Sequence, residues 1–299
     1  MEIMFSSLLQ TIVAVSLAPL GRRRLGEMLA NGAPEYLNGP LRYLLGDPPS
    51  QQDRRRIERV EAIRSQFLDR KGVERLLSAP LELNGRSLKV DLSTVESQKI
   101  ISGWTARISS VRQYWGSFLC LLASAARSKA ILELGSCIGI SGSYLASAES
   151  CEDFTTVEQS PLLASLATMN IHQVARDARI WNTSFDDALD QLLPSLKGKF
   201  DLVYIDGHHE KEPTLHYTNR LLPHLKEGGL FVFDDIHWTS GMLEAWQAIT
   251  RKPGLSLTLD LGRFGIGIRD TQSARPKSYD LSLYTRWWQS GVAVFPGAR

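Results

Sequence analysis

The sequence is poor in cysteine, and the few cysteines present exclude two classes of small protein. Among 299 residues there are three, Cys120, Cys137 and Cys151, and no two of them form a CxxC pair. An odd number of widely spaced cysteines predicts neither a disulfide framework nor a zinc site. We therefore expect free thiols and a reducing, cytoplasmic environment.

A large excess of charge of either sign is also missing. The formal net charge is +2 at pH 7, with 22% charged and 43% hydrophobic residues. This is the composition of an ordinary globular chain, and it argues against disorder. The arginine runs at 22–24 and 54–56 are not interleaved with aromatic residues, so we expect no nucleic-acid partner.

The most apolar stretch, residues 3–20, is not free of polar residues. Ser6, Ser7, Gln10 and Thr11 interrupt it, and its arginines follow it instead of preceding it. These features disfavour a signal peptide or a membrane span. We expect a helix that docks on the protein or forms a homodimer, and a membrane anchor is the weaker alternative.

From residue 129 onward, strand and helix patterns alternate. Such alternation predicts an α/β fold with a mostly parallel sheet. Only Gly262 and Arg263 separate the last two strands, so these strands should form an antiparallel hairpin. We expect strands at 130–134, 153–157, 178–181, 200–205, 230–233, 255–261 and 264–268, and helices at 161–174, 184–193, 215–225 and 241–251.

The pattern before this alternation is mainly helical. Residues 51–77 and 93–126 carry apolar side chains at helical spacing, and Asn84-Gly85 predicts a tight hairpin turn between them. We predict a helical N-terminal cap or oligomerisation region over residues 1–125, an α/β domain over 126–270 and a C-terminal tail over 271–299.

Residues 129–147 join a predicted strand to a predicted helix through a loop that contains Gly135, Gly139 and Gly142. Glycines let a backbone approach a ligand closely, and the first N–H groups of a helix have no partner within the helix. This stretch therefore predicts a binding site for a nucleotide-type cofactor.

Acidic side chains stand at the ends of the later strands. Glu158 ends the second strand, Asp206 the fourth and Asp234 the fifth. Ligands of open parallel sheets bind at this edge, and a carboxylate such as Glu158 can accept the hydrogens of both ribose hydroxyls. The loop is not GxGxxG, and no tyrosine is followed four residues later by lysine, so a nicotinamide dehydrogenase is disfavoured.

Residues 129–270 resemble the class I S-adenosylmethionine-dependent methyltransferases, in particular their small-molecule O-methyltransferase branch. The segment Glu133-Leu134-Gly135, followed by Gly139 and Ser141, is similar to the first motif of that family. Asp234 and Asp235 follow Asp206 at the spacing of the metal-binding positions of catechol O-methyltransferases. The resemblance implies a Rossmann-like, seven-stranded, mostly parallel sheet with an antiparallel last strand.

The resemblance also implies roles for individual residues. Backbone at Gly135 and Ser136 would face the methionine part of S-adenosylmethionine, Glu158 would hold the ribose, and Ser184 and Phe185 would flank the adenine. Core packing is an equal alternative for Phe185. The complete implied cofactor set is Glu133, Gly135, Ser136, Gly139, Ser141, Glu158, Ser184, Phe185 and Asp206.

Asp206, Asp234 and Asp235 would bind Mg²⁺ or another divalent cation, because such ions prefer oxygen ligands. Two positions depart from the family pattern. Asp235 replaces an asparagine, and His209 stands at the position of the catalytic lysine, so His209 or His208 would act as the base together with Asp206. The implied activity is O-methylation of a small hydroxylated metabolite with assistance from the metal.

Two other classes of function stay open. A metal-dependent hydrolase or a non-haem iron oxygenase could use Asp206, His208, His209, Asp234 and His237. A non-catalytic cofactor-binding subunit is the second alternative. A methyltransferase that works by alignment alone, without a metal, is also compatible with the sequence.

Overall fold

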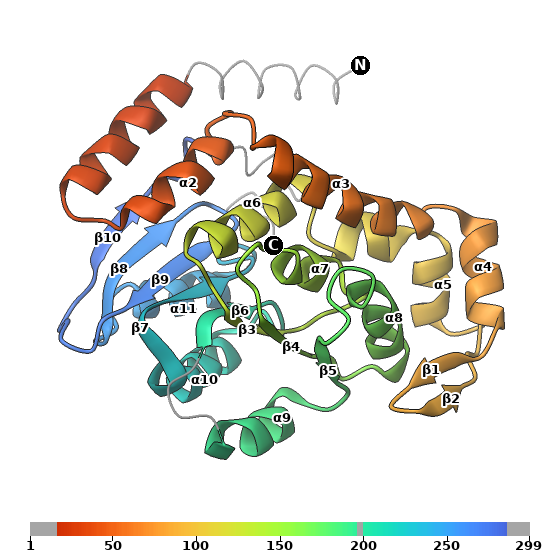
Figure 1. Cartoon of the computed structure of the whole chain (residues 1–299). Helices are drawn as coiled ribbons and strands as arrows, with labels where there is room; N and C mark the ends of the chain where they lie inside the picture. Colours follow the sequence, from red (N-terminus) through yellow and green to blue (C-terminus); the bar gives the residue numbers. More distant parts are fainter. Residues whose placement is uncertain (1–16, 196–199, 286–299) are drawn as a thin grey trace. The chain divides into compact units, whose positions relative to one another are not determined.

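The computed structural model describes residues 17–195 and 200–285, which form two compact units (Figure 1). One unit lies within residues 49–195, and the other combines residues 17–48 with 200–285.

In the unit 49–195, three parallel strands carry the predicted cofactor loop. They are β3 (Ala130–Leu134), β4 (Asp153–Val157) and β5 (Arg179–Trp181), and β4 pairs with both of the others. A mainly apolar run forms β3, and its residues Ile131, Leu132 and Leu134 are almost fully buried. The connecting helices are α6 (Gln113–Ala125), α7 (Ile140–Ala146), α8 (Pro161–Ile171) and α9 (Phe185–Leu192), followed by the short 3-10 helix η3 (Leu193–Ser195).

The same unit begins with helices, but they are shorter than the sequence pattern predicted. The long helix expected at 51–77 is divided into α3 (Gln51–Gln66) and α4 (Arg70–Ser78), because the chain turns at the buried Phe67. The helix expected at 93–126 is interrupted where Gly103 adopts φ +73°, so that α5 (Val95–Ile101) and a π-helix (Thr105–Ser109) precede α6.

The predicted hairpin is confirmed in β1 (Leu81–Leu83) and β2 (Arg86–Leu88). Its two turn residues, Asn84 and Gly85, both have positive φ angles of 50° and 72°. This is the conformation that favours Asn-Gly in a two-residue turn.

The unit of residues 17–48 and 200–285 contains the other strands. β6 (Phe200–Ile205) pairs in parallel with β7 (Leu225–Phe233), and β9 (Gly265–Arg269) runs antiparallel to both β7 and β8 (Leu255–Asp260), as the short Gly262-Arg263 connection predicted. The helices are residues 17–30, η1 (Glu35–Leu37), α2 (Asn38–Leu44), α10 (Lys211–Leu221), η4 (Leu222–His224) and α11 (Ser240–Ile249).

Among the described residues the larger sheet has eight strands, so the expected number of seven was wrong. The additional strand, β10 (Lys277–Asp280), pairs in parallel with β8 and lies in the segment that was predicted to be a tail. It is short and polar, and none of its four residues is buried, as is common for a strand at the edge of a sheet. Trp287, Trp288 and Phe295 of the tail lie outside the described residues, as do residues 1–16 of the apolar N-terminal stretch.

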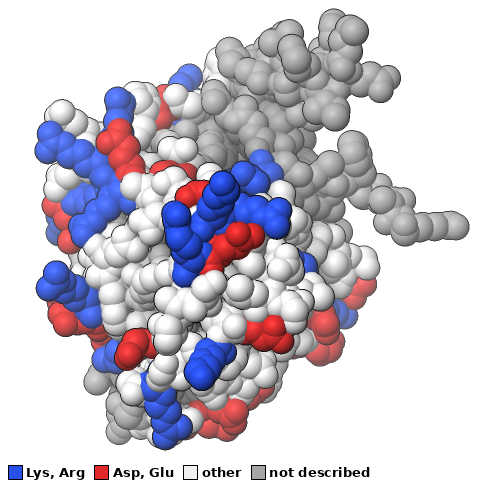
Figure 2. Space-filling model, turned by 90° about the vertical axis from the view of Figure 1, so that its right-hand side faces the viewer, with Lys and Arg blue, Asp and Glu red and all other residues white. Residues whose placement is uncertain are grey.

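Within the part of the chain that the structure describes, no helix has the length and hydrophobicity needed to cross a membrane. Figure 2 shows one face of the molecule, on which basic and acidic side chains lie among one another. Several exposed charges pair one helical turn apart, such as Arg23 with Glu27 and Arg70 with Glu74. Such pairs contribute only about 0.5 kcal/mol each, so the mixed charge matters for solubility more than for stability.

Candidate functional site

The glycine loop leaves β3 at Leu134 and enters α7 at Ile140 (Figure 1). Gly135 and Gly139 have φ angles of 99° and 81°, which side chains disfavour. A Cβ atom on Gly139 would lie only 2.8 Å from the Cα atom of Ala167 in α8. Glycine is therefore required at position 139 both by the backbone conformation and by the close approach of α8.

Glu158 directly follows β4, and its carboxylate is tied to the loop. Its Oε2 atom accepts a hydrogen bond from the backbone N–H of Cys137 (2.9 Å), and Oε1 accepts one from the N–H of Ser160 (2.9 Å). Burial raises the pKa of Glu158, whereas these two N–H groups lower it. A carboxylate oxygen can accept more than one hydrogen bond, so each oxygen can still receive a ligand hydroxyl.

Two residues of this arrangement were not predicted from the sequence. Cys137 has a positive φ of 50°, which is uncommon for a residue other than glycine and places its N–H toward Glu158. Asn182 donates hydrogen bonds to the carbonyl oxygens of Glu158 and Gln159, both at 2.9 Å. The carboxylate of Glu158 is thus held by backbone N–H groups, and its carbonyl oxygen is held by the side chain of Asn182. This fixed position favours a role in holding a ligand.

Glu133 lies beneath the loop and is fully buried. Its Oε2 atom accepts a hydrogen bond from the hydroxyl of Thr156 (2.7 Å) and would lie 2.7 Å from a Cβ atom on Gly142. Burial raises the pKa of Glu133 to about 7, although the hydroxyls of Ser141 and Thr156 oppose this shift. Through these contacts Glu133 supports the first turn of α7. A direct contact of Glu133 with the cofactor stays a prediction.

The other predicted cofactor residues lie in the same unit. Ser136 and Ser141 are buried at the loop and at the start of α7. Ser184 caps α9, because its hydroxyl accepts a hydrogen bond from the N–H of Asp187 and donates one to the carboxylate of that residue. Phe185 is 8% exposed, and its place beside an adenine stays a prediction.

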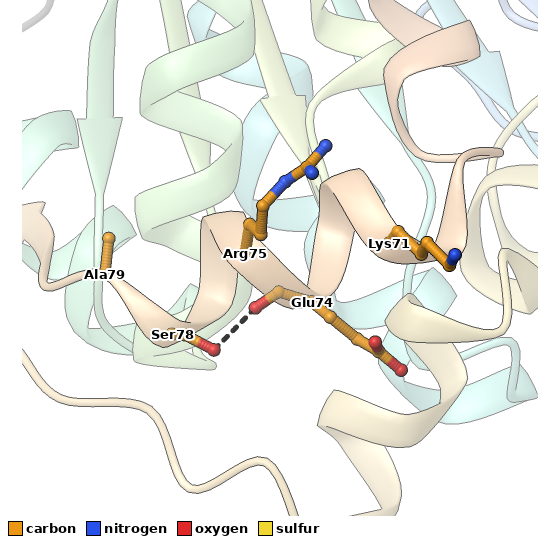
Figure 3. A pocket seen from close by; sticks show the side chains of 5 residues that line it. All are labelled: Lys71, Glu74, Arg75, Ser78 and Ala79. Atoms are coloured by element: carbon orange, nitrogen blue, oxygen red, sulfur yellow. Dashed lines mark hydrogen bonds between the residues drawn. The ribbon is translucent and has the colours of Figure 1, made fainter.

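Two surface hollows lie in the unit 49–195. One, of about 650 Å³, is lined by Lys71, Glu74, Arg75, Ser78 and Ala79, and Figure 3 shows that all five side chains come from α4 and the residue after it. The other, of about 200 Å³, is bordered by the segment from Leu88 to Ser97 and by Pro161 and Leu162 at the start of α8. Only the second hollow adjoins the segment that holds Glu158.

The second cluster of predicted site residues lies in the unit of residues 17–48 and 200–285. Asp206 follows β6, and Asp234 and Asp235 follow β7. His208, His209 and Asp235 have positive φ angles of 61°, 29° and 51°. Strained conformations of this kind persist where the surrounding structure enforces them, which is typical of functional sites.

Arg263 binds Asp234 in a bidentate ion pair that the sequence reasoning missed. Its Nε and NH2 atoms donate to the two carboxylate oxygens of Asp234, both at 2.7 Å, and Nε lies 3.6 Å from Oδ1 of Asp235. Although burial opposes it, the guanidinium holds the pKa of Asp234 below its usual value. Burial and the charge of Asp234 raise the pKa of Asp235.

Tyr204 was also missed. Its hydroxyl lies 3.1 Å from Oδ2 of Asp206 and 3.1 Å from Oδ2 of Asp234, so it links the ends of β6 and β7. Tyr204 lies among the apolar residues of a buried strand, so the sequence gave no signal that its hydroxyl has a polar role. Arg263 gave no signal beyond its place in a two-residue turn.

His209 lies beside one of the three carboxylates, that of Asp206. Its Nε2 atom lies 3.5 Å from Oδ1 of Asp206, and its ring packs edge-on against Trp238. Burial lowers the pKa of His209, so the imidazole is neutral at pH 7 and its contact with Asp206 is not an ion pair. A neutral imidazole in this place can accept a proton.

His237 has a different partner. Its Nε2 atom lies 2.8 Å from Oδ2 of Asp260, and this hydrogen bond raises the pKa of His237 despite its partial burial. The ring is thus engaged by Asp260 and not by Asp206 or Asp234. A non-haem iron site that used His237 as a ligand would require the hydrogen bond between His237 and Asp260 to break.

The three carboxylates do not fit a divalent cation as they are arranged. Both oxygens of Asp234 accept hydrogen bonds from Arg263, so a metal ion at this carboxylate would compete with the guanidinium and be repelled by its charge. In the described residues, no group of three or more His, Cys, Asp or Glu side chains is disposed to hold a metal ion. Metal binding by Asp206, Asp234 and Asp235 therefore stays a prediction, and the arrangement of these side chains does not favour it.

Comparison with known proteins relates the chain to methyltransferases. Residues 132–236 match a family described as a methyltransferase domain. The catechol O-methyltransferase of Mycobacterium tuberculosis is 32% identical over 129 residues, and that of Niastella koreensis is 33% identical over 130 residues. These matches span 43% and 42% of this chain, and 57% and 58% of the relatives, so the chain covers little more than half of either relative.

A solved structure, an O-methyltransferase from Bacillus cereus in complex with SAH, is 22% identical with a TM-score of 0.48. The match covers 54% of this chain and 83% of that protein. The matched segment begins within β3, includes the glycine loop and Glu158, and ends directly after Asp234 and Asp235. Over residues 132–236 the chain is therefore similar to a methyltransferase domain.

Proposed function

We propose that the whole protein transfers the methyl group of S-adenosylmethionine to an oxygen atom of a small hydroxylated molecule. The observation that carries this proposal is the position of Glu158, whose carboxylate is held by the N–H groups of Cys137 and Ser160 beside the glycine loop. When bound, S-adenosylmethionine supplies an electrophilic methyl group, so that the protein needs mainly to align the acceptor and remove its proton.

The residues of the chain fit the binding part of this task. Glu158 would accept hydrogen bonds from the two ribose hydroxyls, since both of its oxygens keep acceptor capacity. Gly135 has no side chain and a φ of 99°, so its backbone can approach a ligand closely. Glu133 would act from beneath by supporting Ser141 and the start of α7.

His209 would remove the proton of the acceptor hydroxyl. Burial keeps its imidazole neutral at pH 7, and Asp206 next to it would stabilise the imidazolium that forms. We prefer His209 to His208 because the ring of His208 packs against Tyr217. The catechol O-methyltransferases among the relatives make catechol-type diols the first acceptors to test.

The test combines binding with turnover. Wild-type protein should bind S-adenosylmethionine in calorimetry and transfer a labelled methyl group to at least one member of a panel of hydroxylated aromatic acceptors. Glu158→Gln should weaken cofactor binding by at least about tenfold, because it loses the charge that attracts two hydroxyl donors. Glu74→Gln, in an exposed pair with Arg70, is the matched control and should bind like wild type.

The hydrolase, oxygenase and non-catalytic alternatives make different predictions. A hydrolase or oxygenase would turn over its substrate without S-adenosylmethionine. A non-catalytic subunit would bind the cofactor but transfer no methyl group to any acceptor. Full methyl transfer by a Glu158→Gln variant with unchanged cofactor affinity would contradict the proposed role of Glu158.

A further inference from the structure

Arg263 is held in place by its backbone as well as by its side chain. Its carbonyl oxygen accepts a hydrogen bond from the N–H of Ile236 (3.1 Å), directly after Asp235 in the chain. Its guanidinium binds both oxygens of Asp234. The arginine is therefore fixed at the end of β7 by two successive parts of the 234–236 segment.

The turn that presents Arg263 is also fixed. Gly262 has a φ of 86°, and its N–H donates to Oδ1 of Asp260 (2.8 Å). The other oxygen of Asp260 accepts a hydrogen bond from the indole N–H of Trp246 (3.0 Å) and contacts His237. Because Asp260 is bound on both oxygens, the turn has little freedom to swing Arg263 away from the carboxylates.

Burial strengthens the pairing of Arg263 with Asp234. The side chain of Asp234 is 1% exposed and that of Arg263 is 10% exposed. A planar guanidinium matches the two oxygens of a carboxylate, and removing one partner of such a buried pair leaves an uncompensated charge. A divalent ion at Asp234 would have to compete with both of these hydrogen bonds and with the positive charge of Arg263.

We propose that Arg263 is the resident cation of the carboxylate cluster, in the place where the sequence predicted a divalent metal ion. Arg263 then acts as a positioning residue, since it fixes Asp234 and neutralises its charge, while Asp235 lies within 3.6 Å of the same guanidinium. This inference rests on the proposed methyl transfer, and it adds that the transfer proceeds without a metal ion.

The first test measures metal binding and needs no turnover. Mn²⁺ is titrated into wild-type protein, and free Mn²⁺ is followed by its paramagnetic resonance signal. We expect no site with a dissociation constant below about 1 mM, since the oxygen ligands of a tight site are missing while Asp234 is occupied. A stoichiometric site tighter than this limit would overturn the proposal, even if no methyl acceptor has been found.

The second test uses two substitutions at one position. Arg263→Met removes the cation but keeps much of the side-chain volume, and it should create a Mn²⁺ site that wild type lacks. Arg263→Lys keeps a charge and should bind no Mn²⁺. Arg275→Met, an exposed arginine of the same unit, is the control and should behave like wild type. A folded Arg263→Met variant that binds no Mn²⁺ would contradict the idea that the arginine replaces a metal.

The third test uses wild-type turnover, so it does not depend on whether the variants fold. Chelation with EDTA followed by dialysis should change the rate of methyl transfer less than twofold, and added Mg²⁺ should not raise it. Loss of turnover with EDTA and its recovery with Mg²⁺ would overturn the metal-free mechanism while leaving the proposed methyl transfer intact. Absence of methyl transfer under every condition would instead count against the proposed function.

Discussion

The buried carboxyl group of Glu133 predicts how the stability of the protein depends on pH. Burial raises the pKa of this group from 4.5 to about 7 in the folded protein, and it is fully shielded from solvent. Between these two values the folded chain binds a proton that the unfolded chain does not. Stability contributed by this group is therefore present below about pH 4.5 and is lost as the pH rises toward 7.

The size of this effect follows from the shift. One pKa unit corresponds to about 1.4 kcal/mol. Ionisation of Glu133 should therefore make the free energy of unfolding about 3 kcal/mol smaller at pH 8 than at pH 4.5. Glu133→Gln removes the ionisation and keeps an oxygen that can accept the hydrogen bond of Thr156. The variant should match wild type near pH 5 and be more stable by about 2–3 kcal/mol at pH 8.

Urea unfolding at pH 5 and pH 8, followed by circular dichroism, measures this difference. Glu152→Gln is the control, because Glu152 forms an exposed pair with Lys129 and its loss should change stability little at either pH. If Glu133→Gln shifts the unfolding free energy equally at both pH values, the carboxyl group does not titrate as described. A variant less stable than wild type at pH 8 would show that Glu133 is needed as an anion.

Three further substitutions test other parts of the structure. Tyr144→Phe removes the 2.6 Å hydrogen bond to Glu61, and it should cost about 1–3 kcal/mol in urea unfolding; an unchanged midpoint would contradict this. Gly139→Ala should cost at least about 2 kcal/mol, because the backbone is strained and Ala167 leaves no space, and a variant as stable as wild type would refute the geometry. His209→Gln should keep the affinity for S-adenosylmethionine and lower turnover about 100-fold; weaker cofactor binding with normal turnover would exclude its role as a base.

Local patterns in the sequence predicted most of the sheet. The strands at Ala130–Leu134, Asp153–Val157 and Phe200–Ile205 have the predicted bounds, because each is short and almost all of its residues after the first two are buried. The Asn84-Gly85 turn followed from the backbone preference of its two residues. The edge strand Lys277–Asp280 was missed, since an edge strand with few buried side chains has no apolar pattern.

The sequence predicted less of the site than of the sheet. Residues at the ends of strands could be named, since the sheet rule places them at one edge. The pairing of Arg263 with Asp234 could not be named, because it joins two loops far apart in the chain. The positive φ angle of Cys137 also has no local signal, because cysteine does not favour that conformation.

Calorimetric titration of S-adenosylmethionine into the wild-type protein and into Glu158→Ala tests the central claim most directly. We predict binding of about one equivalent to wild type with a dissociation constant in the micromolar range, and at least about tenfold weaker binding to the variant. Folded wild-type protein that gives no binding heat at any temperature tested, or a Glu158→Ala variant with wild-type affinity, would contradict it.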